Sequence, residues 1–273
     1  MIAALLIALR EGLEAALIVG IVLGYLKKMG YKRQSAVWWG VASAVAVSIV
    51  AGAALQVLGI AFEGRGEELF EGVTMLLAAG VLTWMIFWMQ RQGRNIRAEL
   101  EADVRQAVTG GSRWALFALA FVAVVREGIE TALFLTAAAF SATPAQTLIG
   151  GGLGLALAVI VGWLLFVVSA RLDVRAFFRV TSVLLILFAA GLVAHGVHEL
   201  QEAGVLPVLI EHVWDVNPIL DEDATLGSIL KSLLGYNGNP SLLEVVSYIG
   251  YFTAIALASW RQSRPLASLA PPA

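Results

Sequence analysis

Long apolar stretches recur along the chain and are separated by short polar or charged connections. Each stretch runs for roughly twenty residues, the length that an α-helix needs to cross the ~30 Å hydrocarbon core of a bilayer. The pattern predicts seven membrane-spanning helices at 2–26, 36–61, 68–90, 114–140, 146–170, 177–200 and 241–260. The chain is therefore expected to be an all-α polytopic membrane protein.

Composition agrees with this class. Of the 273 residues, 59% are hydrophobic and 14% are charged, and the mean hydropathy is +0.84. The first apolar stretch has no basic leader and carries Arg10 and Glu11, so we expect it to be retained as a span rather than cleaved as a signal peptide. The absence of cysteine excludes disulfides and thiolate metal sites.

Basic residues are concentrated on alternate connections. Fourteen of the 18 Lys and Arg residues follow the first, third, fifth or seventh span. Because cytoplasmic loops are enriched in Lys and Arg, the orientation is expected to be N-out/C-in. The fourteen are Lys27, Lys28, Lys32, Arg33, Arg91, Arg94, Arg97, Arg105, Arg113, Arg171, Arg175, Arg179, Arg261 and Arg264.

Acidic residues have the opposite distribution. Twelve acids map to the outer face or its margin, where only Arg65 and Lys231 oppose them. Their summed field predicts a cation-attracting vestibule, although any single acid is equally well explained as a solvated loop residue. The twelve are Glu63, Glu67, Glu68, Glu71, Glu199, Glu202, Glu211, Asp215, Asp221, Glu222, Asp223 and Glu244.

The first three predicted spans are repeated in the next three. REGLEAALIVG at 10–20 corresponds to REGIETALFLT at 126–136, and LLAAGVLTW at 76–84 to LFAAGLVAH at 187–195. Three spans per copy invert the second copy, as in transporters whose substrate site lies at the midplane. We expect one integral membrane domain (1–273) that comprises repeat one (1–90), inverted repeat two (114–200), an external loop (201–240) and a seventh helix (241–261).

Three charged residues lie in the middle of the first span and again in the fourth: Arg10, Glu11 and Glu14, and Arg126, Glu127 and Glu130. Helix positions three and four apart share a face, so each set gathers within about one turn. Facing lipid, each charge would cost at least ~2.5–3.5 kcal/mol, so we expect them to face each other or water. One interpretation is a structural clamp between the two spans.

The charges of the two motifs do not balance. Four carboxylates accompany two guanidiniums, and a clamp would not need the two surplus negative charges. A bound divalent cation cancels them, and carboxylate oxygens suit hard cations. The residues therefore predict a cation site in the membrane without identifying the cation.

Several motifs resemble those of a known family. REGLE and REGIE, ELFEG at 68–72, LTWMIFWM at 82–89 and GYNGNPSLLEV at 235–245 are similar to the high-affinity, oxidase-dependent iron permeases with paired REGLE motifs, and closest to the bacterial, EfeU-type branch. The resemblance covers essentially the whole chain. It implies that iron is the transported substrate, not a tightly bound cofactor, and that the ligands are Glu11, Glu14, Glu127 and Glu130, with Arg10 and Arg126 as charge partners.

The resemblance also implies the protein's surroundings. These are the bacterial cytoplasmic membrane, its lipid bilayer and an external partner protein that oxidises or delivers iron, with no nucleic acid involved. Whether the site takes ferrous or ferric iron, and whether the pathway is channel-like, stays open.

Two pairs of residues at the outer side are secondary candidates for metal binding. Glu68 and Glu71 begin the third span, where the resemblance implies iron capture, and His198 and Glu199 lie at the outer end of the sixth. Acids at a helix N-terminus also complement the helix dipole, and histidines near an interface are often only hydrogen-bonded. Both interpretations stay open at these positions.

Three connecting or glycine-rich segments have structural interpretations. The 91–113 loop is expected to form a solvated helix of mixed charge, and Leu226–Leu234 a short helix lying against the membrane. The glycines at 150–152 and 154 indicate close helix packing, because no Lys-Ser/Thr follows them as in a phosphate loop.

Other functions use similar residues. The same ligands would serve Mn²⁺ or Pb²⁺, and intramembrane carboxylates also relay protons. A membrane di-iron oxidoreductase is expected to carry Glu-x-x-His pairs, which this sequence lacks. We therefore expect a transporter rather than an enzyme.

Overall fold

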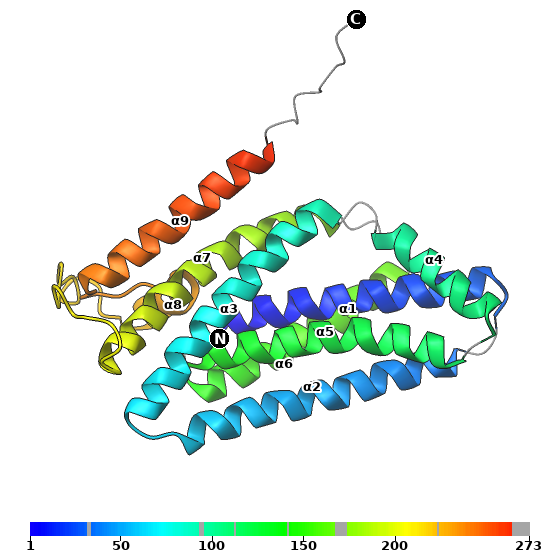
Figure 1. Cartoon of the computed structure of the whole chain (residues 1–273), viewed down its shortest axis with the longest axis horizontal. Coiled ribbons are helices and arrows are strands. Elements are labelled where there is room, and N and C mark those ends of the chain that lie inside the picture. Colours follow the sequence, from blue (N-terminus) through cyan, green and yellow to red (C-terminus); the bar gives the residue numbers. More distant parts are fainter. Residues whose placement is uncertain are drawn as a thin grey trace, which may run out of the picture.

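The computed structural model of this chain describes residues 1–31, 34–92, 96–111, 113–140, 142–166, 174–222 and 224–263. Within these ranges all regular elements are helices, as expected (Figure 1). They are α1 (Ile2–Lys28), α2 (Ser35–Ala61), α3 (Arg65–Gln92), α4 (Ile96–Thr109), α5 (Arg113–Phe140), α6 (Pro144–Phe166), α7 (Val174–Glu202), α8 (Thr225–Leu234) and α9 (Leu242–Ser263).

Part of the expected orientation signal falls outside the described residues. Five of its basic residues and one outer acid are affected: Lys32, Arg33, Arg94, Arg171, Arg264 and Asp223. The side chains of Arg91, Arg97 and Arg175 are not described either.

The long helices follow the predicted apolar stretches. In the described part of the chain, α2, α3, α6, α7 and α9 are long and apolar enough to cross a membrane. α1 and α5 have comparable lengths of 27 and 28 residues, but each carries one of the charged motifs in its middle. Outward-facing apolar side chains suit contact with lipid: Ile60 of α2 is 80% exposed and Leu148 of α6 is 75% exposed.

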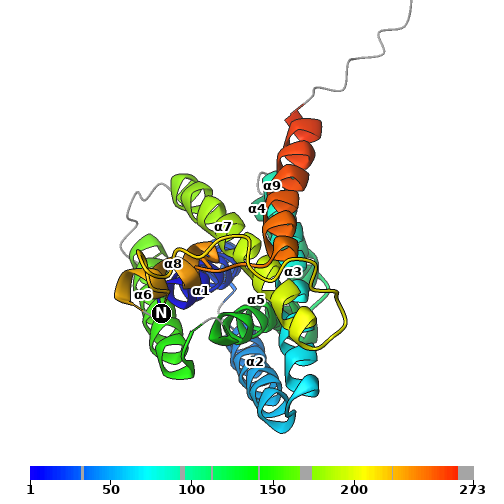
Figure 2. The same ribbon diagram turned by 90° about the vertical axis from the view of Figure 1, so that its left-hand side faces the viewer.

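The helices pair across the chain rather than along it. The most extensive contacts join α2 to α5, α1 to α6, and α3 to α7, while α1 and α5 also contact each other. Figure 2 shows α1, α5 and α6 grouped beside one another in the end-on view. The two motif-bearing helices therefore lie inside the bundle, each covered by a helix from the other half of the chain.

Small residues permit these close pairings. A Cβ added at Gly40 of α2 would lie 2.6 Å from the carbonyl oxygen of Phe117 in α5. One added at Gly150 of α6 would meet the carbonyl oxygen of Met1, at the start of α1. This confirms the interpretation of Gly150, Gly151 and Gly154 as packing residues, since close backbone approach requires the smallest side chains. The interpretation is wrong for Gly152, which is exposed and has no atom within 4 Å of an added Cβ.

The two short helices are held against protein. α4 forms where a helix of mixed charge was expected, but Val104 is fully buried and packs in a cluster with Val22 of α1 and Leu116 of α5. The expectation of a fully solvated helix is therefore wrong for this face of α4. α8 begins one residue before the expected segment and contacts α7 and α1, with Leu233 packed on the core between α1, α3, α5 and α7.

Candidate metal centre

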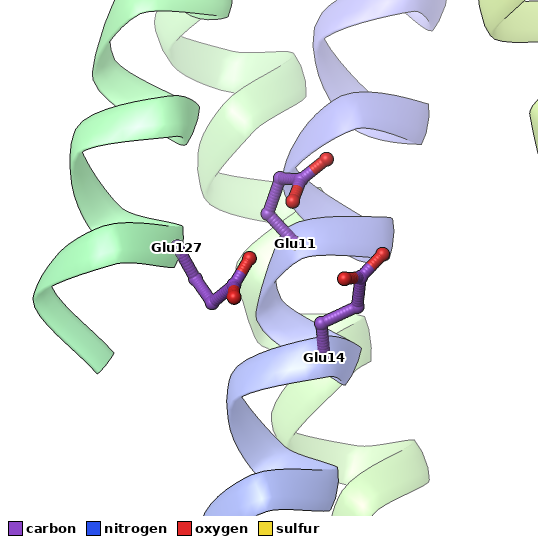
Figure 3. A group of neighbouring side chains, drawn as sticks. All are labelled: Glu11, Glu14 and Glu127. Atoms are coloured by element: carbon purple, nitrogen blue, oxygen red, sulfur yellow. The ribbon is translucent and has the colours of Figure 1, made fainter. Parts of the chain in front are cut away.

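The carboxylates of the two charged motifs meet where α1 and α5 pass each other. One oxygen each from Glu11, Glu14 and Glu127 can be chosen so that all three lie within 4.8 Å of one another. Figure 3 shows Glu11 and Glu14 on successive turns of α1, with Glu127 reaching toward them from α5. All three residues are buried, Glu11 completely. Such a group can supply several oxygen ligands to one cation.

The glycine of each motif allows a neighbouring helix to approach closely. A Cβ at Gly12 would lie 2.7 Å from the Cβ of Ala158 in α6, and one at Gly128 would lie 2.6 Å from the Cβ of Ser48 in α2. The first motif is thus packed against α6 and the second against α2, in each case a helix from the other half of the chain.

Arg10 is completely buried beside the two acids of its own motif. Its Nη1 lies 3.3 Å from Glu11 Oε1, and its Nη2 lies 3.3 Å from Glu14 Oε1. The same nitrogens donate to the thioether sulfurs of Met85 at 3.4 Å and Met89 at 3.0 Å, both on α3. The guanidinium is therefore shared between two carboxylates and two sulfurs.

Arg126 occupies the corresponding motif position in a different environment. Its side chain is 33% exposed, and its Nε donates a 2.9 Å hydrogen bond to Glu130 Oε1. The guanidinium lies over the ring of Trp88 at 4.4 Å and near that of Trp84 at 5.6 Å. Cation–π contacts of this kind hold a guanidinium in place without neutralising it.

Glu130 is thereby set apart from the other three carboxylates. It was expected as a ligand on equal terms, but the three-carboxylate group comprises Glu11, Glu14 and Glu127. Its Oε1 is already bound to Arg126. Glu130 lies next to the group rather than in it.

Each of the four motif carboxylates keeps one buried oxygen without a hydrogen-bond partner. These atoms are Glu11 Oε2, Glu14 Oε1, Glu127 Oε2 and Glu130 Oε2. Leaving a buried polar atom unpaired costs about 1–3 kcal/mol, and more where the group is charged. Glu14 Oε1 still lies 3.3 Å from Arg10 Nη2 as an ion pair. A structural clamp would use the other three oxygens to bind the arginines as well, whereas a cation site keeps them available.

The secondary outer candidates are distributed over two places. Gly72 of α3 packs on Gly196 of α7, which brings the acids near it, Glu68 and Glu71, to the same side as Glu199. Among the described residues, these acids and His198 do not form a group with metal-ligating spacing. The acids gather at one end of α3 and α7, and a role in metal binding stays a prediction for them.

His198 is engaged by carboxylates on both sides of its ring. Its Nδ1 lies 3.0 Å from Glu244 Oε1, and its Nε2 lies 3.3 Å from Glu202 Oε1. Glu244 is buried and also accepts hydrogen bonds from Asn237 Nδ2 at 2.8 Å and the backbone N–H of Ser241 at 3.0 Å. In this arrangement His198 ties α9 and the preceding loop to α7.

Sequence reasoning assigned no role to the side chains of α3 that surround the arginines. Met85 and Met89 contact Arg10, and Trp84 and Trp88 contact Arg126. The available signal was the LTWMIFWM motif at 82–89, which had entered only as part of a resemblance.

Comparison with known proteins places this chain among iron permeases. The family model described as "Iron permease FTR1 family" matches residues 1–260. A protein named ferrous iron permease EfeU from Escherichia coli O6:K15:H31 is 38% identical over 256 residues, which cover 93% of each chain. The EfeU of Shigella sonnei matches equally well, and that of Yersinia pestis is 35% identical over 249 residues, covering 90% of this chain and 88% of its own. No solved structure matches. The chain belongs to the iron permease FTR1 family.

Proposed function

We propose that this protein imports iron across the bacterial inner membrane through the carboxylate group between α1 and α5. Membership of a permease family makes it an integral membrane transporter, rather than an enzyme, with iron as its substrate. The proposed ligands are Glu11, Glu14 and Glu127, with Glu130 next to them. The observation that carries the proposal is the spacing of the first three, whose oxygens lie within 4.8 Å although all three residues are buried.

Charge supports the same site. Four carboxylates and two arginines leave a surplus of two negative charges if all are ionised, and Fe²⁺ would cancel it. Oxygen ligands suit a hard or borderline cation. A negative potential inside favours cation entry by ~2.3 kcal/mol per charge per 100 mV. The potential would thus assist release toward the cytoplasm.

The proposed architecture is seven spans in an inverted repeat. Spans one to three (1–90) would be repeated by spans four to six (114–200), followed by the external loop (201–240) and the seventh span (241–261). The helix pairing supports this proposal, because exchanging the two halves turns the α1–α6 pair into the α5–α2 pair. Release would follow from rocking of these pairs about the site.

Individual contacts support the repeat more closely. Glu11 and Glu127 are equivalent motif positions separated by 116 residues, and so are Met1 and Phe117. The carbonyl oxygen of Met1 lies against Gly150, and that of Phe117 lies against Gly40. One backbone contact is thus made in both halves.

The proposed N-out/C-in orientation has a direct test, because the chain contains no cysteine. A single cysteine at Glu63, before α3, will react with a membrane-impermeant maleimide in intact spheroplasts. A cysteine at Thr109, at the end of α4, will react only after permeabilisation. The reverse pattern would overturn the orientation.

An external partner completes the proposal. Iron arriving from outside would be oxidised or delivered by a separate protein, and the segment between α7 and α9 is the proposed docking surface for it. Deleting such a partner would lower iron uptake in cells and leave uptake into proteoliposomes unchanged.

The test of the proposed site is iron uptake by the Glu14→Gln variant. Gln keeps the shape of the side chain and removes its charge, so we expect uptake of radioactive iron into proteoliposomes to be lost at matched protein content. Asp103→Asn is the matched control, because Asp103 is exposed on α4 and belongs to neither the motifs nor the outer acids. If the Glu14→Gln variant still takes up iron, the proposed site is wrong and the two motifs act as a structural clamp between the helices.

Competition identifies the cation. Because carboxylates also bind Mn²⁺ and Pb²⁺, each is added at tenfold excess over iron. If Mn²⁺ or Pb²⁺ strongly inhibits iron uptake and is itself taken up, the proposed site is supported but the assignment of iron as the substrate is wrong.

A further inference from the structure

One turn of α3 contacts the arginines of both motifs. Met85 and Met89 accept hydrogen bonds from Arg10, and Trp88 lies under Arg126. Both methionines belong to the LTWMIFWM motif at 82–89, for which the proposed function has no role. Met85 is fully buried in the core cluster that also contains Ile7 of α1, so its sulfur is held in place by packing.

The distances around Arg10 are uneven. Its Nη2 is closer to Met89 Sδ, at 3.0 Å, than to Glu14 Oε1, at 3.3 Å. Charge-assisted N–H···O bonds usually measure about 2.7–2.9 Å. Arg126 provides the comparison within the same protein, since it binds Glu130 at 2.9 Å. Arg10 is thus held farther from Glu14 than Arg126 is from the equivalent Glu130. Its distance to Glu11, 3.3 Å, is shorter than the 4.0 Å that separates Arg126 from Glu127.

We propose that Met85 and Met89 are positioning residues that keep Arg10 drawn back from Glu11 and Glu14, so that an incoming cation can take their oxygens. This inference rests on the proposed function. A thioether is a weak, neutral acceptor, and it competes with a carboxylate for an N–H only where water is excluded, as it is around this fully buried guanidinium.

The unpaired oxygens agree with this role. Glu11 Oε2 and Glu14 Oε1 are buried and have no hydrogen-bond partner, although a guanidinium with five N–H donors lies beside them. Without the sulfurs, Nη1 and Nη2 would turn fully onto these carboxylates. A cation would then have to displace a tight ion pair before it could bind.

The experiment measures Fe²⁺ binding by the purified full-length protein under anaerobic conditions, together with uptake kinetics. Met→Leu conserves volume and removes the acceptor. We expect the Met85→Leu/Met89→Leu double variant to raise both the Kd for Fe²⁺ and the KM for uptake about fivefold, with Vmax unchanged. Met89→Gln restores an acceptor and is expected to return the Kd toward the wild-type value.

Met75→Leu is the matched control. Met75 lies on the same helix and in the same core cluster, and is equally buried. Among the described residues, the methionines that accept hydrogen bonds from Arg10 are Met85 and Met89, and Met75 is not one of them. Its replacement is expected to leave the Kd unchanged. If Met75→Leu raises the Kd as much as the double variant does, the effect is one of packing and the inference is wrong.

A second comparison separates positioning from direct metal ligation. In an Arg10→Gln background, replacing the two methionines should have no further effect on the Kd, because no guanidinium is left to position. A fivefold rise that persists there would make the sulfurs ligands and overturn the inference. An unchanged Kd in the double variant would overturn it as well.

Failure of the proposed function is distinguishable from failure of this inference. If Glu14→Gln transports iron normally, the site itself is wrong. If Glu14→Gln is inactive while the methionine variants bind iron normally, only the role of Met85 and Met89 is wrong. Where the double variant does not give monodisperse protein, Met89→Leu alone carries the same test.

Discussion

Glu11→Gln and Glu127→Gln will each reduce iron uptake by about thirtyfold or more. The two side chains belong to equivalent positions of the two motifs, and both contribute to the buried group of three carboxylates. Removing one charged partner from a buried interaction costs about 2–5 kcal/mol, which corresponds to a factor of thirty or more. Uptake is measured in proteoliposomes at matched protein content, and Fe²⁺ binding by titration calorimetry.

Glu130→Gln provides the internal comparison for binding. Since Glu130 Oε1 is taken by Arg126 at 2.9 Å, its replacement should weaken Fe²⁺ binding less, by about tenfold. Equal losses of affinity for all four variants would mean that the carboxylates act through total charge rather than through the described geometry. Unchanged binding in Glu11→Gln and Glu127→Gln would rule out the proposed site.

Gly154→Leu will disrupt the α1–α6 contact and with it the folded protein. A Cβ at Gly154 would meet the carbonyl oxygen of Leu5 and lie 2.9 Å from the backbone nitrogen of Leu9. These are backbone atoms of a helix, so they cannot move aside as a side chain would, and we expect a loss of stability of about 3 kcal/mol. The measurement is the fraction of detergent-solubilised protein that stays monodisperse as temperature rises.

Gly152→Leu is the matched control. Gly152 lies two residues away on the same helix, is exposed, and has no atom within 4 Å of an added Cβ. Its replacement should leave the midpoint temperature within a few degrees of wild type. If both variants are equally stable, α6 does not pack on α1 through this face. Gly40→Leu tests the equivalent contact of α2 with α5 and should behave like Gly154→Leu.

The sequence alone determined the helices, the motifs and the family. Hydropathy and length are local properties, so the apolar stretch predicted at 36–61 coincides with α2 (Ser35–Ala61) to within one residue. The central charges of α1 and α5 were conspicuous because charge in lipid is costly. The duplicated REGLE motif indicated the family to which the chain belongs.

Tertiary structure decided how these elements meet. The pairing of α1 with α6 and of α2 with α5 depends on small residues such as Gly40 and Gly150 opposing particular backbone atoms far away in the chain. No local pattern encodes which backbone will lie opposite a glycine. For the same reason, the buried face of α4 could not be read from its mixed charges.

The inequality of the two motifs is also a tertiary result. REGLE and REGIE predict equal environments, yet Arg10 is fully buried against two sulfurs, while the Arg126 side chain is 33% exposed against two indoles. Both sets of contacts come from α3. The sequence similarity places the two motifs at equivalent positions of α1 and α5. The side chains that α3 presents to them differ, because Arg10 meets methionines and Arg126 meets tryptophans, so the two environments are unequal.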